Sequence, residues 1–300
     1  MNKPEKIMAF LHWDLDGVVC YFMLRWTFPN ANIEYIPTTV TGFRLNYMKW
    51  LSNHNIDDYD VVFIMDLSVF NDKDIIDNKK VFIIDHHASD DTYVYKHARV
   101  AIKPEGSASM LAYKIFKDFY KIKLTKPQLH LLVLADDFDS YTLKYKDSYN
   151  LNIVFWDTTN KFESFVESFS KGFNGFSKQQ QAIIRIHDRN VQKFKDEMVV
   201  YAGTIHIQDG NRYVCSTFAK HYINEVADIL INTYNADIAL VINTNTNHVS
   251  YRKNNDKCNV NLSTLAANLA VGGGGHEFSS GSEITEDFME FIKPLKKLDI

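Results

Sequence analysis

The segment that most constrains the fold of this chain is Val-Phe-Ile-Ile-Asp-His-His at residues 81–87. Its first four residues are apolar or β-branched and predict a short buried strand, and Asp85, His86 and His87 follow at the end of that strand. A buried strand holds the residues at its end rigidly at the rim of a sheet, where ligands of α/β proteins usually bind. Taken alone, the triplet is equally compatible with histidines that only hydrogen-bond to nearby loops.

Two earlier apolar segments also end in aspartate or histidine, residues that can bind a metal ion. Residues 7–11 predict a strand that runs directly into His-Trp-Asp-Leu-Asp-Gly at 12–17, and residues 60–66 predict another that ends in Asp66. Alternating strands and helices are typical of a parallel, doubly wound sheet, so we expect an N-terminal α/β domain of that type. The remaining elements predicted in this part are a strand at 33–36 and helices at 18–28, 43–51, 72–78 and 106–120.

Residues with metal-binding side chains gather at the ends of these strands. The carboxyl ends of parallel strands meet at one edge of a sheet, so these side chains are expected to lie close together. An apolar helix predicted at 127–135 adds three aspartates, of which Asp136 is preferred because it follows the helix directly. The candidates are His12, Asp14, Asp16, Asp66, Asp85, His86, His87 and Asp136, with Asp137 and Asp139 as alternatives to Asp136.

So many carboxylates need compensating positive charge, because burying them unpaired is costly. Oxygen-rich ligand sets with a few imidazoles suit manganese or magnesium, and this set has no thiolate of the kind found in structural zinc sites. One interpretation is a pair of ions bridged by Asp66. The other ligands in this interpretation are His12 and Asp14 for one ion, and Asp16, His86 and Asp136 for the second.

Such a pair of ions indicates phosphoryl-transfer chemistry. Two divalent ions about 3.5–4 Å apart can activate a water molecule and stabilise the charge of an in-line displacement. His87 is not needed as a ligand and is a candidate to donate a proton to a phosphate or leaving-group oxygen. Asp85 is a candidate to orient a histidine. A lone aspartate at a strand end is usually a cap or turn residue, but the recurrence at several element ends favours a dinuclear site.

The second half of the chain predicts a smaller α/β domain with a glycine run. Four glycines at 272–275 precede His276, and such a turn lets a phosphate approach the backbone amides; the alternative is a flexible loop after a helix. Arg252, on an earlier strand, can pair with a phosphate in fork geometry. The elements predicted here are strands at 204–207, 212–215 (paired around Asp209 and Gly210), 237–242 and 248–252, and helices at 219–234 and 262–271.

We therefore expect three parts along the chain. Residues 1–150 form the catalytic domain, 151–200 a helical connector and 201–300 the substrate-binding domain. Two helices with polar surfaces, at 161–170 and 177–200, suggest the connector.

Composition limits the partners. A net charge of −4 argues against a wide binding surface for duplex DNA but leaves room for a local pocket that binds a few phosphates. The three cysteines are widely spaced and odd in number, which fits neither a disulfide framework nor a zinc ribbon. No apolar run approaches the roughly 18 residues of a membrane span. We expect a cytoplasmic protein without a membrane partner.

The ordered motifs resemble those of the DHH phosphoesterase family. They are the His12–Gly17 segment, the Asp66 strand, Asp85-His86-His87 and the glycine-rich segment with His276, and together they span residues 7 to about 281. The glycine-rich segment is similar to that of the DHH-associated C-terminal domain in the RecJ and nanoRNase branch, and the short oligoribonuclease type is the most similar. The resemblance implies two α/β domains with the active site in a cleft between them. It also implies two manganese ions and metal ligands at His12, Asp14, Asp16, Asp66, His86 and Asp136.

The same resemblance implies that His87 faces the substrate. It also implies substrate binding by Arg252, Gly274, Gly275 and His276. The expected function is a manganese-dependent phosphodiesterase, with magnesium as the other metal, that cleaves very short oligonucleotides to mononucleotides. Other activities left open are hydrolysis of cyclic or linear dinucleotide messengers, of 3′-phosphoadenosine 5′-phosphate or, less favoured, of pyrophosphate. A nucleotide sensor without turnover is the non-enzymatic alternative, and a homodimer is an open option.

Overall fold

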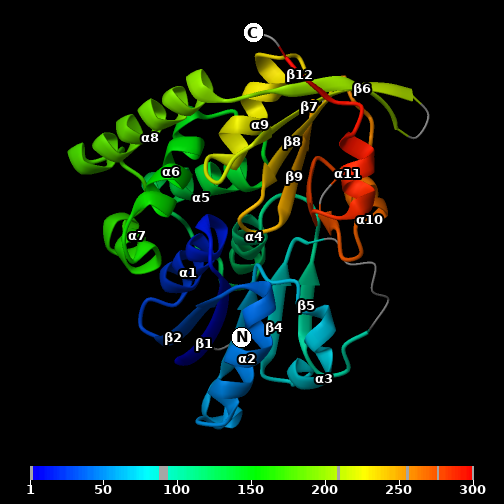
Figure 1. The fold of residues 1–300 in the computed structure, drawn as a ribbon. Coiled ribbons are helices and arrows are strands. Elements are labelled where there is room, and N and C mark those ends of the chain that lie inside the picture. Colours follow the sequence, from blue (N-terminus) through cyan, green and yellow to red (C-terminus); the bar gives the residue numbers. More distant parts are fainter. Residues whose placement is uncertain (1–2, 88–93, 208–209, 255–256, 276, 299–300) are drawn as a thin grey trace. The chain divides into compact units, whose positions relative to one another are not determined.

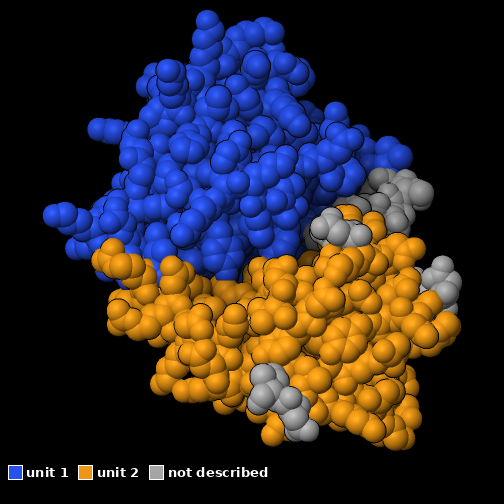
Figure 2. All heavy atoms as spheres, turned by 90° about the horizontal axis from the view of Figure 1, so that it is seen from above, with its two compact units in different colours: residues 1–184 blue, residues 185–300 orange. Residues whose placement is uncertain are grey.

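The computed structural model of this chain describes residues 3–298 except 88–93, 208–209, 255–256 and 276. The chain divides into two compact units, residues 1–184 and 185–300, which are coloured separately in Figure 2. Each unit has its own sheet (Figure 1). No helix in the described part of the chain is long and apolar enough to cross a membrane.

The first unit is built on a five-stranded sheet with the order β2-β1-β3-β4-β5, in which all neighbours run parallel. All five residues of β3 are buried, as expected of a central parallel strand that is covered on both faces. The predicted parallel sheet is therefore confirmed, and β5 is a strand that the sequence did not reveal. The strands are β1 (Lys6–His12), β2 (Asn32–Thr38), β3 (Val61–Met65), β4 (Val81–Asp85) and β5 (Arg99–Ile102).

Helices cover both faces of this sheet, so the fold is doubly wound. On one face, Phe28 and Phe116 belong to a core that includes residues of α1 and α4; on the other, Tyr47 and Trp50 of α2 pack around Phe10. This packing fixes the strand ends from which the candidate site is built. The helices are α1 (Leu15–Thr27), α2 (Val40–Leu51), α3 (Lys73–Ile76), α4 (Ala108–Tyr120), α5 (Lys126–Asp139), α6 (Lys146–Asp157) and α7 (Lys161–Phe169), with short 3-10 turns at Ile56–Asp58 and Phe70–Asp72.

Helices α6 and α7 belong to the first unit. Phe155 of α6 and Phe162 and Phe165 of α7 are buried in the same core as α1, and the rings of Phe155 and Phe165 meet edge to face at 5.6 Å. Residues 151–184 therefore differ from the polar connector expected at 151–200. Their aromatic side chains supply the apolar contact area that ties them to the first core.

The second unit has a seven-stranded sheet with the order β10-β11-β9-β8-β7-β6-β12. Strands β7 and β8 are parallel and the other neighbours are antiparallel. The turn expected around Asp209 lies outside the described residues, but the two strands flanking it are paired as predicted. The strands are β6 (Tyr201–Ile207), β7 (Gly210–Phe218), β8 (Ile238–Asn243), β9 (His248–Lys253), β10 (Gly274–Gly275), β11 (Ser279–Glu283) and β12 (Lys296–Lys297).

Four helices accompany this second sheet. Val226 and Leu230 of α9 lie in the core on one side, and Leu265 of α10 and Phe288 of α11 lie in the core on the other. The helices are α8 (Lys178–Glu197), which crosses from one unit to the other, α9 (Ile223–Asn232), α10 (Leu262–Leu269) and α11 (Glu286–Ile292). The predicted architecture of two α/β domains is confirmed.

Candidate metal centre

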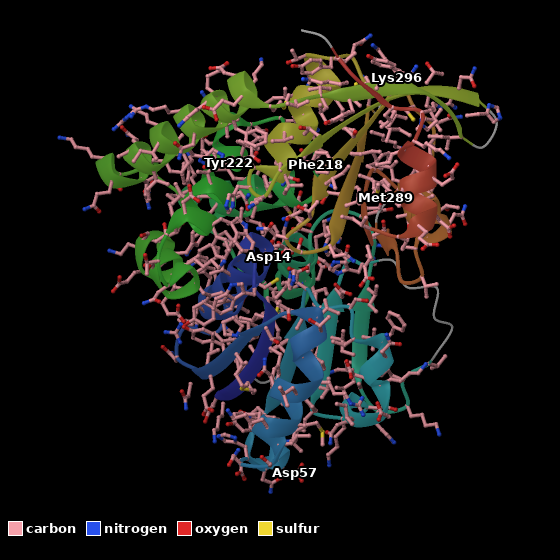
Figure 3. The ribbon with its side chains drawn as sticks, viewed as in Figure 1. Asp14, Asp57, Phe218, Tyr222, Met289 and Lys296 are labelled. Atoms are coloured by element: carbon pink, nitrogen blue, oxygen red, sulfur yellow. The ribbon has the colours of Figure 1, made fainter. Side chains whose placement is uncertain are left out.

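The first part of the candidate centre is the junction between β1 and α1, where Figure 3 labels Asp14. Oδ2 of Asp14 lies 2.7 Å from Nδ1 of His12, and Oδ1 accepts a hydrogen bond from the Gly17 amide at 2.9 Å, so Asp14 also caps α1. Gly17 is needed here because a Cβ at this position would collide with the carbonyl oxygen of His12. The tight turn therefore brings the first two candidate ligands together.

Asp66 lies between two histidines at the end of β3. Its Oδ2 is 3.5 Å from Nδ1 of His12, and its Oδ1 is 3.3 Å from Nε2 of His86. The side chain is 1% exposed, and the backbone adopts φ 59°, a left-handed conformation that aspartate tolerates better than most residues. Strained backbone of this kind persists where surrounding structure holds it, as the hydrogen bond from the Asp66 amide to Ile84 does here.

The third part follows β4. Oδ1 of the buried Asp85 accepts a hydrogen bond from the backbone amide of His86 at 2.9 Å and lies 2.7 Å from Nδ1 of His87. A carboxylate in this position fixes the orientation of the His87 ring and favours the tautomer with the proton on Nδ1. This geometry supports the predicted roles of Asp85 and His87, which stay predictions.

Asp16 and Asp139 complete the centre from two helices. Asp16, in the first turn of α1, accepts hydrogen bonds from the Ser109 amide at 3.2 and 3.3 Å, near the start of α4. Oδ2 of Asp139, the last residue of α5, lies 3.4 Å from Nε2 of His86. These two carboxylates and His86 form one group of possible metal ligands.

Asp136, the preferred ligand from the sequence, lies outside the groups of possible ligands among the described residues. Its Oδ1 accepts a hydrogen bond from the Ser107 amide at 2.8 Å. Asp137 is also engaged elsewhere, since its carboxylate accepts hydrogen bonds from the hydroxyls of Thr142 and Ser148, both at 2.6 Å. The structure thus places Asp139, rather than the preferred Asp136, beside Asp16 and His86, because α5 continues past residue 135 to Asp139.

The structure otherwise brings together every candidate predicted for the N-terminal metal site. Within each group, one donor atom from every residue lies within 4.8 Å of all the others. Asp66 belongs to two of the groups and His86 to two. The groups are His12, Asp14 and Asp66; Asp16, His86 and Asp139; and Asp66, Asp85, His86 and His87.

Burial and mutual repulsion make these carboxylates hard to ionise without a cation. Burial raises the pKa of Asp66 and Asp139 well above the usual range, and the neighbouring charge of Asp16 raises both further. Burial lowers the pKa of His12, but Asp14 and Asp66 outweigh this effect and raise that pKa to about 11. The charges of the cluster are thus balanced poorly by the protein alone.

These residues fit two divalent ions. Among the described residues, neither Oδ2 of Asp66 nor Oδ2 of Asp139 receives a hydrogen bond, although both atoms are buried. Buried carboxylate oxygens normally have partners, so these two atoms are available to a cation. Each three-residue group offers two carboxylates and one imidazole, a combination that suits manganese and also accommodates magnesium.

The candidate substrate residues of the second unit lie on neighbouring strands. Arg252 of β9 is opposite Ser279 of β11, and Gly275 of β10 is opposite Ser280 of β11. Gly275 has φ 137°, and a Cβ there would clash with the backbone of Ser279, so this glycine is needed for packing as well as for any ligand. Nη2 of Arg252 donates to Asn224 at 2.7 Å.

The other two candidate substrate residues are Gly274 and His276, of which the structure describes only Gly274. A Cβ added to Gly274 would meet nothing closer than the Ser263 hydroxyl at 3.8 Å. Packing therefore does not explain a glycine at 274. The approach of a ligand to the backbone here stays a prediction. His276 lies outside the described residues.

Comparison with known proteins identifies the fold. No family model and no curated protein matches this sequence. RecJ from Thermus thermophilus in complex with Mn²⁺ has a TM-score of 0.60 and 11% sequence identity, covering 96% of this chain and 51% of RecJ. The pGpG-specific phosphodiesterase PggH from Vibrio cholerae has a TM-score of 0.57 and 11% identity, covering 96% of each chain. An exopolyphosphatase-related protein from Bacteroides fragilis has a TM-score of 0.55 and 15% identity, covering 97% of this chain and 90% of its own.

The chain therefore has the two-unit fold of the DHH phosphoesterases. The resemblance found in the sequence is confirmed at the level of this fold. The identities are too low to carry an activity from one protein to another, so the activity must be argued from the residues themselves.

Proposed function

We propose that this protein is a metal-dependent phosphodiesterase that cleaves very short oligonucleotides to mononucleotides. The observation that carries the proposal is the position of Asp66, whose two carboxylate oxygens face His12 and His86, one in each three-residue ligand group. A carboxylate in this position can bridge two ions, which is the arrangement used for in-line displacement at phosphorus. Two manganese ions are the proposed cofactors, with magnesium as the alternative.

The protein's own groups have distinct tasks in this reaction. When bound, the two ions activate a water molecule and neutralise charge on the phosphate. The carboxylates of Asp14, Asp16 and Asp139 hold these ions at the sheet edge. His87, oriented by Asp85, is placed to donate a proton to a phosphate or leaving-group oxygen.

Two observations favour a small nucleotide substrate. The net charge of −4 gives the chain little general attraction for long polyanions, so recognition has to be local. PggH, which this chain matches over 96% of both lengths, acts on a linear dinucleotide according to its name. Linear or cyclic dinucleotide messengers are accordingly the second candidate substrate class, and a cytoplasmic location is proposed for either activity.

The test is turnover by metal-stripped protein after addition of manganese or magnesium. The substrates are an RNA dinucleotide, a pentanucleotide, a long RNA, a cyclic dinucleotide and 3′-phosphoadenosine 5′-phosphate. We expect rapid release of mononucleotides from the two short RNAs and little from the long one. A preference for the cyclic or bisphosphate compound would reject the oligonucleotide assignment but keep the chemistry, whereas binding without turnover would favour the sensor.

A pair of matched variants links any turnover to this centre. Asp66→Asn removes the bridging charge with almost no change in shape, and turnover should be lost. Asp57→Asn makes the same chemical change at an exposed site in the 3-10 turn before β3, at the opposite end of the first sheet from Asp14 (Figure 3), and turnover should be retained. Equal activity of the two variants would reject the proposed centre.

A further inference from the structure

A shallow pocket with two tryptophans lies in the first unit, which also holds the candidate metal centre. It has a volume of about 510 Å³ and is lined by Trp13, Trp156, Thr158, Asn160, Lys161 and Glu163. Trp13 stands in the sequence between His12 and Asp14, which are both candidate ligands. The pocket is therefore tied to the centre through one tripeptide.

The wall of this pocket is held from beneath by buried aromatic rings. Phe162 of α7 is fully buried, and its ring centroid lies 6.3 Å from that of Trp13. Phe162 also stacks on Tyr35 at 5.4 Å. Phe155, the neighbour of Trp156, is buried in the core of the first unit, so α6 anchors Trp156 just as α7 anchors Lys161. Both sides of the pocket are thus positioned by the core of one unit.

Two features of the pocket are not explained by packing. Trp156 is 47% exposed, although a tryptophan gains most by being buried. Nζ of Lys161 lies 3.6 Å from the Trp156 ring centroid and 5.8 Å from that of Trp13, and it has no carboxylate partner among the described residues. A cation–π pair on the surface accounts for the contact between Lys161 and Trp156. It does not account for a tryptophan at position 13, between two candidate metal ligands in the sequence.

We propose that Trp13 and Trp156 form a stacking platform for an unpaired nucleobase of the substrate, and that Lys161 contacts the phosphate attached to it. Every nucleobase has a flat π-face, so such a platform binds single strands with little sequence preference. A pocket of this volume has room for a nucleoside. The inference rests on the proposed function, because the scissile phosphodiester would lie at the candidate metal centre.

This platform would also explain a preference for single-stranded over duplex substrates. A base inside a duplex is already stacked and paired, so it is not available to the tryptophans without a cost of a few kcal/mol. A dinucleotide offers its bases freely. The platform would therefore select the substrate by the availability of a base rather than by its identity.

The first experiment pairs a protein variant with a substrate variant. KM is measured for an RNA dinucleotide and for its abasic analogue, with the unaltered protein and with Trp156→Ala. We expect Trp156→Ala to raise KM for the dinucleotide between about 5-fold and 150-fold, the range for loss of one stacked base, with kcat unchanged. For the abasic analogue, which has no base to stack, Trp156→Ala should leave KM unchanged. Equal effects on both substrates would overturn the proposal.

Two further variants control for damage to the fold. Phe119→Ala removes another exposed aromatic side chain of the first unit that does not line the pocket, and KM should stay unchanged. Trp156→Phe retains a stacking ring and should recover most of the affinity. A Trp156→Phe variant as weak as Trp156→Ala would overturn stacking as the cause.

The role of Lys161 is tested by salt dependence. Added salt screens the attraction between an ammonium group and a phosphate. Lys161→Gln should therefore make binding of the dinucleotide less sensitive to added salt, while Lys161→Arg should restore the sensitivity. An unchanged salt dependence in Lys161→Gln would remove the phosphate contact from the proposal.

A binding measurement separates this proposal from the proposed function. Calorimetry of the dinucleotide with metal-stripped protein measures base binding without turnover. Weaker binding by Trp156→Ala supports the platform even if no substrate is cleaved in the turnover assay. Cleavage of the dinucleotide with identical binding by both proteins would keep the phosphodiesterase and reject the platform.

Discussion

Oδ2 of Asp139 lies 3.4 Å from Nε2 of His86, and both residues belong to one group of possible metal ligands with Asp16. Asp136, almost one turn earlier on α5, instead accepts a hydrogen bond from the Ser107 amide. We expect Asp139→Asn to lose one of the two ions and to lower turnover by about 100-fold or more, since even residues outside the ligand shell cost 10–100-fold. Metal content per chain and kcat measure both effects.

The matched control for this prediction is Asp136→Asn. Its amide oxygen can still accept the hydrogen bond from Ser107, so metal content and kcat should stay close to those of the unaltered protein. Loss of an ion in Asp136→Asn, with normal content in Asp139→Asn, would contradict the assignment made from the structure.

Removing the charge of Asp66 should stabilise the metal-free protein while it abolishes function. Asp66 is 1% exposed, and burial together with Asp14 and Asp16 raises its pKa well above the usual range. Asparagine has the same shape and also tolerates the left-handed backbone at this position. We expect Asp66→Asn to raise the free energy of unfolding of the metal-free protein by about 1–3 kcal/mol, within the usual range of single substitutions.

Thermal unfolding after metal removal measures this effect. Asp57→Asn provides the comparison, because that exposed side chain lies in the 3-10 turn before β3, outside the ligand groups, and the melting temperature of this variant should not change. A lower melting temperature for metal-free Asp66→Asn would show that the carboxylate stabilises the fold, contrary to the argument from burial.

The metal-free protein should lose stability as the pH rises. Burial raises the pKa of Asp66 and Asp139, so the folded chain keeps protons that the unfolded chain releases above about pH 4. Such groups stabilise the fold below their unfolded pKa, and this contribution is lost as pH rises through the raised folded pKa. His12 acts in the same direction: burial lowers its pKa, but Asp14 and Asp66 outweigh that and raise it to about 11.

Unfolding measured at a series of pH values from about 6 to about 10 tests this relationship. The decline should be shallower in Asp66→Asn, which lacks one of the titrating groups. Added manganese should stabilise the protein more at high pH, because metal ligands bind in their deprotonated forms. Parallel pH curves for the two metal-free proteins would remove Asp66 from this account.

His87 should affect rate without affecting metal content. Its Nδ1 lies 2.7 Å from Asp85, and its pKa, which burial lowers, is raised overall by that carboxylate. If His87 donates a proton, His87→Ala should lower kcat by about 100- to 10,000-fold while both ions stay bound. Asp85→Asn should lower the pKa of His87, so the alkaline limb of the kcat profile should move to lower pH. A profile that does not move would leave Asp85 without the proposed positioning role.

The sequence predicted which side chains cluster where backbone geometry decides the outcome. His12, Asp66 and His86 each stand at the end of a parallel strand, and the register of parallel strands brings such ends to one edge whatever the side chains are. The hydrogen bond from the Gly17 amide to Asp14 likewise joins residues only three positions apart. These contacts follow from periodicity and short spacing, which are visible in the sequence.

The sequence failed where the answer depends on helix length and rotation. Three of the last four residues of α5 are aspartates, and each successive residue of a helix turns by about 100°. Apolar periodicity placed the end of that helix at 135, whereas it continues to Asp139. The tryptophan pocket is a similar case, because Trp13 and Trp156 are far apart in the sequence and line one pocket only once α6 and α7 pack into the core of the first unit.

Arg252 is the residue of the second unit on which substrate binding should depend. It lies on β9 beside the strand that pairs with the glycine segment, and Asn224 holds one arm of its guanidinium at 2.7 Å. We expect Arg252→Ala to raise KM by about 10-fold or more with little change in kcat, since a bidentate phosphate contact acts in the ground state as well as the transition state. Arg252→Lys should recover little of the loss, because a point charge lacks the fork geometry.

Arg189→Ala, at an exposed position of α8 in the same unit, should leave KM unchanged. A fall in kcat with KM unchanged in Arg252→Ala would instead assign Arg252 to stabilisation of the transition state.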